Sequence, residues 1–150
     1  MSDILQYWPE DKFDPREVQV QALEWIEKQT AKYLILQAPV ASGKSHIAMT
    51  ASNYFGGNGV GNSFILTPQK VLQKQYKDTF EEDLAFALYG KANYSCEMKN
   101  CSCDVGSLIK PRCRECPYTQ AVADALNAPN IIMNYTMAFL MLNFHPSFPK

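Results

Sequence analysis

Two groups of residues in this chain of 150 could do chemistry, and the first is a turn suited to binding an anion. Residues 38–45 read Ala-Pro-Val-Ala-Ser-Gly-Lys-Ser, after the apolar run 33–37 and before the helix-like segment 43–54. Strand, loop and helix in this order are typical of a phosphate-binding P-loop, in which backbone N–H groups and the positive end of the helix face the anion. We expect Lys44 to reach the outer phosphates of a nucleotide and the Ser45 hydroxyl to hold Mg²⁺.

The whole loop is expected to line this nucleotide site. Its residues are Ala38, Pro39, Val40, Ala41, Ser42, Gly43, Lys44 and Ser45. Ala38 stands where such loops usually have their first glycine, so the loop has to accommodate a Cβ atom there. The alternative is a chance Gly-Lys-Ser at a helix start, which the flanking strand and helix patterns disfavour.

The second group consists of the five cysteines, all between residues 96 and 116. Their spacing is Cys96-x4-Cys101-x-Cys103-x9-Cys113-x2-Cys116. Closely spaced thiolates on irregular backbone suit either tetrahedral Zn²⁺ or an iron–sulfur cluster, and since each takes four thiolates, one cysteine is spare. The alternative of buried free thiols is disfavoured by the polar sequence around them. The cations that would stabilise thiolates, and could also face a phosphate backbone, are Lys110, Arg112 and Arg114.

Composition sets limits on the class of protein. Apolar residues make up 47% of the chain, which favours a folded domain over disorder, and a net charge of −1 gives no overall attraction for nucleic acid. We find neither a secretory leader nor an apolar stretch long enough to span a membrane. We therefore expect a cytoplasmic protein of bacterial or phage type without a membrane partner, in a reducing compartment where clustered cysteines bind metal.

Apolar spacing predicts alternating helices and strands. Asp14-Pro15 is expected to begin a helix that runs to Gln29, with the aspartate as its N-cap. The remaining expected elements are strands over 33–37, 63–67 and 130–134, and helices over 43–54, 118–126 and 135–142, with a polar helix after Pro68 that contains Val71, Leu72, Tyr76 and Phe80. This order predicts parallel βα units and an α/β fold. Regular spacing fails over 89–117, which we interpret as an irregular insertion held by metal.

Taken in order, these motifs resemble those of the iron–sulfur superfamily 2 DNA helicases, the XPD/DinG-like group. The matching segments are Arg16-x-x-Gln19, the Walker A motif at 38–45, a motif Ia at 66–75, the segment 90–96 that delivers the first cluster ligand, Cys116-Pro117-Tyr118 that delivers the last, and Asn134-Tyr135. Motif Ia alone is weak, and Walker A alone indicates only a nucleotide. The cysteines inserted between motif Ia and Asn-Tyr make the combination specific.

The resemblance implies a partial RecA-like P-loop domain with parallel strands, in which 1–88 and 118–150 belong to the ATP-binding lobe and 89–117 to an iron–sulfur insertion. Gln19 would contact the adenine of ATP. The residues that would grip single-stranded DNA are Thr67, Lys70 and Gln73. The resemblance shifts the metal preference to a [4Fe–4S] cluster, with Zn²⁺ as the alternative. Its expected ligands are Cys96, Cys103, Cys113 and Cys116, with Cys101 as the substitute for Cys103.

The chain also departs from this family. The helicases need an Asp-Glu box that binds Mg²⁺ and orients water, and a second RecA-like lobe. No acidic residue follows Tyr135, and the adjacent acids at 81–83 precede the cysteines, in the wrong place. We therefore expect a fragment of an ATP-dependent helicase, of the 5′–3′ type by resemblance, that binds ATP and single-stranded DNA but turns over negligible ATP alone.

Two other functions are weighed against this one. A non-catalytic, zinc-stapled module derived from a P-loop protein, binding nucleic acid or protein, would explain the absent acids. A P-loop kinase would explain neither motif Ia nor the cysteines. Three tyrosines near the cysteines could stack on bases or pack around the metal centre, and these are Tyr89, Tyr94 and Tyr118.

Overall fold

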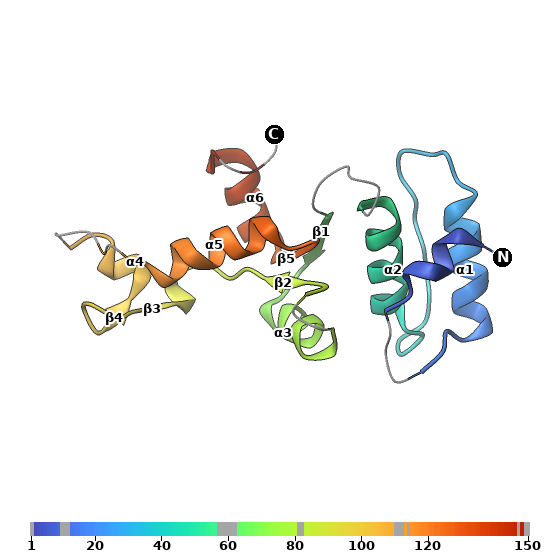
Figure 1. The fold of residues 1–150 in the computed structure, drawn as a ribbon, viewed down its shortest axis with the longest axis horizontal. Coiled ribbons are helices and arrows are strands. Elements are labelled where there is room, and N and C mark those ends of the chain that lie inside the picture. The colour runs from blue at the N-terminus through green and yellow to red at the C-terminus, as the bar shows by residue number, and fades with distance from the viewer. Residues whose placement is uncertain are drawn as a thin grey trace. The chain divides into compact units, whose positions relative to one another are not determined.

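The computed structural model describes residues 2–9, 13–56, 63–80, 83–109, 113, 115–146 and 148 (Figure 1). The chain divides into two compact units, Met1–Ser63 and Phe64–Lys150, which we describe separately. This division lies earlier in the chain than the boundary expected between 88 and 89. The cations Lys110, Arg112 and Arg114 lie outside the described residues.

The first unit contains the 3₁₀-helix η1 (Asp3–Tyr7) and the helices α1 (Glu17–Glu27) and α2 (Lys44–Gly56). Its core is formed by one side chain of η1, two of α1 and one of α2, namely Ile4, Leu23, Ile26 and Ile47. Leu23 and Ile26 are three residues apart, so they share one face of α1. The carboxylate of Glu27 accepts hydrogen bonds from the Ser2 hydroxyl and, at 3.0 Å, from the backbone N–H of Ile4, which ties η1 to the end of α1.

Helix α1 begins later than expected, because Arg16 rather than Asp14 is its N-cap residue. The Gln19 side chain accepts a hydrogen bond from the backbone N–H of Arg16 at 2.8 Å. This bond satisfies a donor at the helix start, and the expectation that Asp14 caps the helix is therefore wrong.

The expected strand over 33–37 is also wrong, because these residues belong to none of the described strands. Their side chains are largely exposed, up to 90% for Ile35. An apolar run becomes a strand only where a neighbouring strand accepts its backbone hydrogen bonds, and no described strand does so here.

The second unit is built on a three-stranded sheet of order β1–β5–β2, formed by Ser63–Thr67, Asn130–Asn134 and Phe86–Ala87. Strands β2 and β5 are parallel, with Phe86 opposite Ile131. The central strand β5 is almost wholly buried, as expected for a parallel strand covered on both faces. The expected strands at 63–67 and 130–134 and the mixed α/β class are thereby confirmed.

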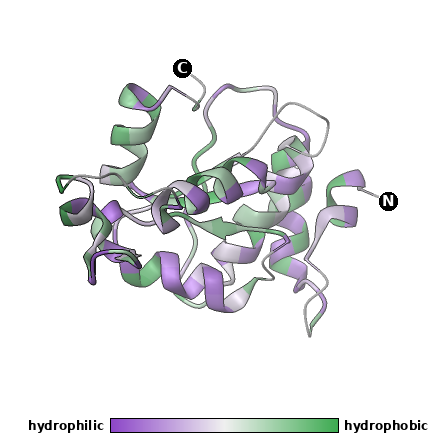
Figure 2. Ribbon diagram, turned by 60° about the vertical axis from the view of Figure 1, so that its left-hand side comes forward, coloured by the Kyte–Doolittle hydropathy of each residue, from purple (hydrophilic) through white to green (hydrophobic). Residues whose placement is uncertain are grey.

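Three longer helices accompany this sheet, namely α3 (Lys70–Thr79), α5 (Pro117–Asn127) and α6 (Tyr135–Phe144). Helix α5 has proline at its first position, which is a favourable start because proline lacks the N–H that would be unpaired there. Helix α6 is largely apolar (Figure 2), and the Asn134 side chain caps it by accepting from the backbone N–H of Met137 at 2.8 Å. The helices expected in these places are confirmed with small changes of boundary.

The expected insertion contains four short elements, namely η2 (Lys91–Asn93), β3 (Ser95–Cys96), β4 (Cys101–Ser102) and α4 (Cys103–Gly106). Strands β3 and β4 form an antiparallel hairpin in which Cys96 lies opposite Cys101. These elements lie together at one end of the unit, next to the start of α5 (Figure 1). Three of the five cysteines, Cys96, Cys101 and Cys103, are therefore carried by short elements, while Cys113 and Cys116 belong to no helix or strand.

Candidate thiolate centre and phosphate-binding loop

The loop before α2 contains two residues in the left-handed region of backbone conformation. Ala41 and Gly43 both have positive φ angles, 62° and 80°, which is the left-handed region that favours glycine. The carbonyl of Gly43 accepts the first helical hydrogen bonds, from His46 at 3.0 Å and Ile47 at 3.2 Å. Helix α2 thus starts directly after the loop, and its first N–H groups have no partner within the helix.

Lys44 is folded back onto the loop. Its Nζ atom donates to the backbone carbonyls of Ala38, at 3.0 Å, and Pro39, at 2.6 Å. The ammonium group therefore lies at the centre of the loop, where an arriving phosphate could replace these neutral acceptors with a stronger, charged one.

Gln19 holds the loop to α1. Its Nε2 atom donates to the backbone carbonyl of Ser42 at 3.2 Å, while its Oε1 atom accepts from Arg16. A Cβ atom at Gly43 would collide with this amide, so the close approach requires glycine. Gln19 is only 3% exposed. Both its amide oxygen and its amide nitrogen are hydrogen-bonded, so the side chain links α1 to the loop.

A cavity of about 460 Å³ lies between the start of α1 and the loop, lined by residues of α1, by 36–42 and by Ile47. Arg16, Gln19 and the loop residues Ala38 to Ser42 all contribute to it. The Ser42 Oγ atom is buried and has no hydrogen-bond partner among the described residues. The two segments expected to bind one nucleotide therefore line one cavity.

His46, in the first turn of α2, lies against two aromatic rings. Its ring centroid is 5.4 Å from that of Trp8, in a stacked arrangement, and 5.1 Å from that of Phe13. Both rings precede α1, and the sequence pattern gave no signal for this packing. The contact joins the segment before α1 to the first turn of α2.

The cysteines gather around a second cavity, in the second unit. Its volume is about 390 Å³, and it is lined by four of the five cysteines together with Lys91, Ser107 and Thr119. The four are Cys96, Cys103, Cys113 and Cys116. They come from β3, from α4, from residue 113 and from the residue before α5, so the fold brings four separate segments to one place. Cys101 does not line this cavity.

The four sulfurs do not converge on a single point. The Sγ atoms of Cys96 and Cys113 are 3.1 Å apart. Within the described part of the chain, however, no three histidine, cysteine or acidic side chains are grouped closely enough to hold one metal ion. A tetrahedral zinc site needs its sulfurs about 2.3 Å from a common centre. The sulfurs lie in close pairs instead, with Cys96 beside Cys113 and Cys103 hydrogen-bonded to Cys116.

The thiols form two pairs with opposite pKa shifts. The hydrogen bond between Cys96 and Cys113 lowers the pKa of Cys96 and raises that of Cys113. Burial raises the pKa of Cys103. Burial also opposes ionisation of Cys116, but hydrogen bonding from Thr119, Tyr118 and Cys103 outweighs it and lowers the pKa of Cys116. Each pair therefore contains one thiol whose pKa lies below the usual value, which favours the thiolate form that binds metal.

Two of the three residues expected to grip DNA are interior. Gln73 is fully buried, and its Nε2 atom donates to the carbonyls of Leu88, at 3.0 Å, and Ile132, at 3.3 Å. Thr67 is also buried, and its hydroxyl donates to the carbonyl of Gln69 at 3.2 Å. These side chains hold the sheet and the turn before α3, so neither offers a surface contact to a nucleic acid.

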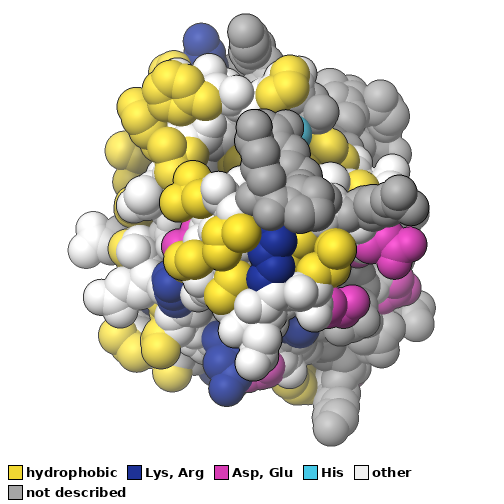
Figure 3. Space-filling view, turned by 90° about the vertical axis from the view of Figure 1, so that its left-hand side faces the viewer, with side chains coloured by type: hydrophobic (Ala, Val, Ile, Leu, Met, Phe, Trp, Pro, Cys, Tyr) yellow, Lys and Arg dark blue, Asp and Glu magenta, His cyan; other side chains and the backbone are white. Residues whose placement is uncertain are grey.

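Lys70, the third expected DNA contact, is exposed. Its Nζ atom donates to Asn93 Oδ1 at 2.9 Å, which links the start of α3 to η2. On the face of the molecule over the cysteine-rich end, lysine and hydrophobic side chains lie next to each other (Figure 3). Lys70 is thus the expected contact that remains available to a phosphate.

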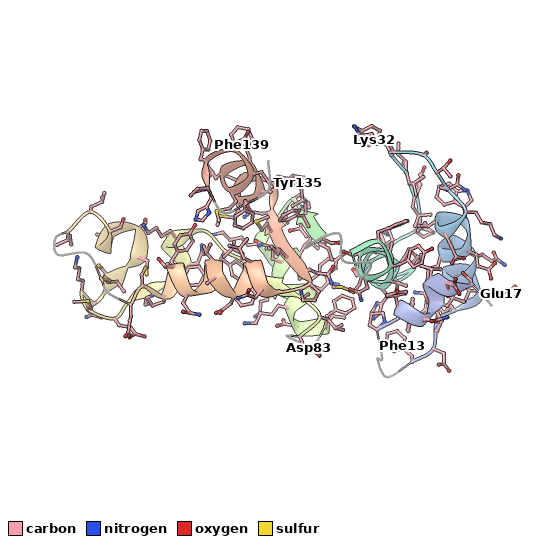
Figure 4. All side chains as sticks on the ribbon, turned by 45° about the horizontal axis from the view of Figure 1, so that its top comes forward. Phe13, Glu17, Lys32, Asp83, Tyr135 and Phe139 are labelled. Carbon is pink, nitrogen blue, oxygen red and sulfur yellow. The ribbon has the colours of Figure 1, made fainter. Side chains whose placement is uncertain are left out.

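The tyrosines near the cysteines are packed. The rings of Tyr94 and Tyr118 meet edge to face with centroids 5.6 Å apart, and the Tyr94 hydroxyl accepts from the backbone N–H of Tyr89 at 3.2 Å. Burial raises the pKa of Tyr94 and of Tyr118. These contacts favour packing beside the cavity over stacking on bases. Exposed aromatic side chains occur instead on α6, where Tyr135 and Phe139 point away from the sheet (Figure 4).

Comparison with known proteins gives no further assignment. No family model, no curated protein and no solved structure matches this chain. Among the described residues, no helix is long and apolar enough to cross a membrane.

Proposed function

We propose that this chain is part of an ATP-binding helicase lobe that carries a [4Fe–4S] cluster on Cys96, Cys103, Cys113 and Cys116. The observation that carries the proposal is the cavity shared by these four thiols, which come from separate elements and leave Cys101 outside. Four thiolates are the donor set of such a cluster. Together with the P-loop in the first unit, this is the combination that the motif order implies.

The motif order, rather than the spacing of the thiols, favours a cluster over a single ion. In a [4Fe–4S] cluster each thiolate binds a different iron, so the four sulfurs need not meet at one point. The sulfurs of Cys96 and Cys113, which are 3.1 Å apart, would have to separate to reach different irons. When bound, the cluster would supply a rigid cross-link between β3, α4 and the start of α5.

The first unit supports the nucleotide part of the proposal. Lys44 and the N–H groups at the start of α2 would hold the phosphates of ATP, and the Ser45 hydroxyl would hold Mg²⁺. Gln19 contributes by fixing the loop through Ser42, and any contact with adenine requires that its amide first be released. Single-stranded DNA would be engaged through Lys70 in the second unit.

The test is the metal content of the full chain purified without oxygen. We expect a brown protein with broad visible absorption and four irons and four sulfides per chain. Cys113→Ser should lose this colour, whereas Cys101→Ser should keep it because Cys101 lies outside the cavity. Colourless wild-type protein containing one zinc ion per chain would refute the cluster.

One zinc ion per chain would support the second candidate, a non-catalytic module whose cysteines are cross-linked by zinc. Its supporting observation is the run 33–37, which should be a strand beneath the P-loop but belongs to no described strand and is exposed. Stoichiometric zinc together with no measurable ATP binding would favour this candidate over the helicase lobe.

A further inference from the structure

The fifth cysteine, Cys101, has no role in the proposed centre. It lies on β4 directly opposite Cys96 on β3, while Cys96 itself lines the cavity. Directly opposed residues of an antiparallel pair have Cα atoms about 4.5–5.5 Å apart. This range falls within the about 4.4–6.8 Å that a disulfide spans.

Gly106 shows that both sulfurs point to the same side of the hairpin. A Cβ atom built on this glycine would lie 3.0 Å from Cys96 Sγ and 3.5 Å from Cys101 Sγ. The two thiols therefore flank one point on α4, where the missing side chain leaves them room. Cys96 is buried and Cys101 is half-buried, so Cys101 is the more accessible of the pair.

We propose that Cys96 and Cys101 form a disulfide when the metal-free protein meets a peroxide, and that this disulfide removes Cys96 from the metal centre. One thiolate attacks the peroxide oxygen, giving a sulfenic acid and releasing water. The other thiolate then attacks that sulfur and displaces a second water. In balance, two thiols and one hydrogen peroxide give one disulfide and two waters, with the peroxide as the oxidant.

Cys113 competes for the same partner, because its sulfur is 3.1 Å from that of Cys96. In the metal-free chain two features favour Cys101. The hairpin ladder holds Cys101 opposite Cys96, and both sulfurs lie beside the space that Gly106 leaves open. Loss of the metal therefore leads to a defined cross-strand product rather than to a mixture.

The sequence makes the product directly measurable. Trypsin cleaves after Lys91 and Lys99, so Cys96 is carried on peptide 92–99, and Cys101 and Cys103 on peptide 100–112. Cys113 is released on the separate peptide 113–114. The full chain is stripped of metal with a chelator, treated with one equivalent of hydrogen peroxide, alkylated and digested without reductant.

We expect peptides 92–99 and 100–112 joined by a disulfide as the major cross-linked species. Cys101→Ser should abolish this species, while Cys103→Ser, which changes the other cysteine of the same peptide, should retain it. A major cross-link between 92–99 and 113–114, or a wild-type yield in Cys101→Ser, would overturn the proposal. Far-ultraviolet circular dichroism of both variants checks that they are folded.

Protection of the two thiols from oxidation by bound metal rests on the proposed function, whereas formation of the disulfide in the metal-free chain does not. If the chain binds metal, the loaded protein should form the cross-link several-fold more slowly than the stripped protein. A chain that binds no metal would lose this protection but would still form the cross-link, so the two proposals fail separately.

Discussion

Gln73 illustrates how a residue of a recognisable motif can have a structural role. Its amide nitrogen donates to carbonyls of β5 and of the residue after β2, and its own oxygen is buried with no hydrogen-bond partner among the described residues. The amide thus ties α3 to two neighbouring parallel strands. The motif position suggested a DNA contact, but burial places the side chain in the interior.

Replacing Gln73 with alanine should destabilise the second unit. The change removes the donor to the Leu88 carbonyl, which costs about 1–3 kcal/mol when a buried acceptor is left unsatisfied, whereas the Ile132 carbonyl still accepts from the backbone N–H of Leu88 at 3.0 Å. We expect a lower urea midpoint for Gln73→Ala, measured by circular dichroism. Gln75→Ala, an exposed position on the same helix, is the matched control and should leave the midpoint unchanged. Equal midpoints for the two variants would contradict the structural role.

Lys44 is the residue on which the proposed nucleotide binding depends most. Its ammonium group already lies on the loop, at 2.6 Å from the Pro39 carbonyl, and would exchange this neutral acceptor for phosphate. Lys44→Ala should weaken Mg-ATP binding at least about tenfold, or about 1.4 kcal/mol, in isothermal titration calorimetry. Lys77→Ala, an exposed lysine of the second unit, is the control. An unchanged affinity in Lys44→Ala would remove the P-loop from the proposal.

At the scale of elements, the contact of α4 with the β3–β4 hairpin shapes the thiolate cavity. Gly106 at the end of α4 is the point of closest approach, since an added Cβ atom would lie 3.0 Å from both Cβ and Sγ of Cys96. No positive φ is required there, so the constraint is the space between the elements. The shape of the cavity therefore depends on the small residue Gly106 as well as on the cysteines that line it.

Gly106→Ala should push β3 away from α4 and shift Cys96 out of position. We expect less metal bound per chain, measured by elemental analysis after identical loading. Gly90→Ala is the matched control, because a Cβ atom there would meet only Asn93 Nδ2, at an ordinary 3.6 Å. If both variants load as fully as the wild type, Gly106 does not shape the site.

At the scale of the molecule, the sequence was most informative where neighbouring residues decide the structure. The run Ser63–Thr67 and the run Asn130–Asn134 are short and apolar, and both became strands of one sheet. The four cysteines that the family resemblance implied as ligands also line one cavity. These outcomes follow from local pattern and from the limited reach of short loops.

Features that depend on distant partners were beyond sequence reasoning. The run 33–37 has the composition of a strand, but whether it forms one depends on a neighbour elsewhere in the chain. Gln19 likewise matched a nucleotide-binding motif, yet its amide is engaged by Arg16 and Ser42. In both cases tertiary contacts, which no local pattern encodes, decide the outcome.

The exposed run 33–37 affects how the protein behaves in concentrated solution. Four consecutive large side chains, Tyr33, Leu34, Ile35 and Leu36, present apolar area to water. Contiguous apolar surface of this kind promotes association between molecules, and strand-like composition directs such association toward aggregation through shared sheets. Dilute handling, or a charged substitution at Ile35, therefore suits preparation of this chain for the measurements above.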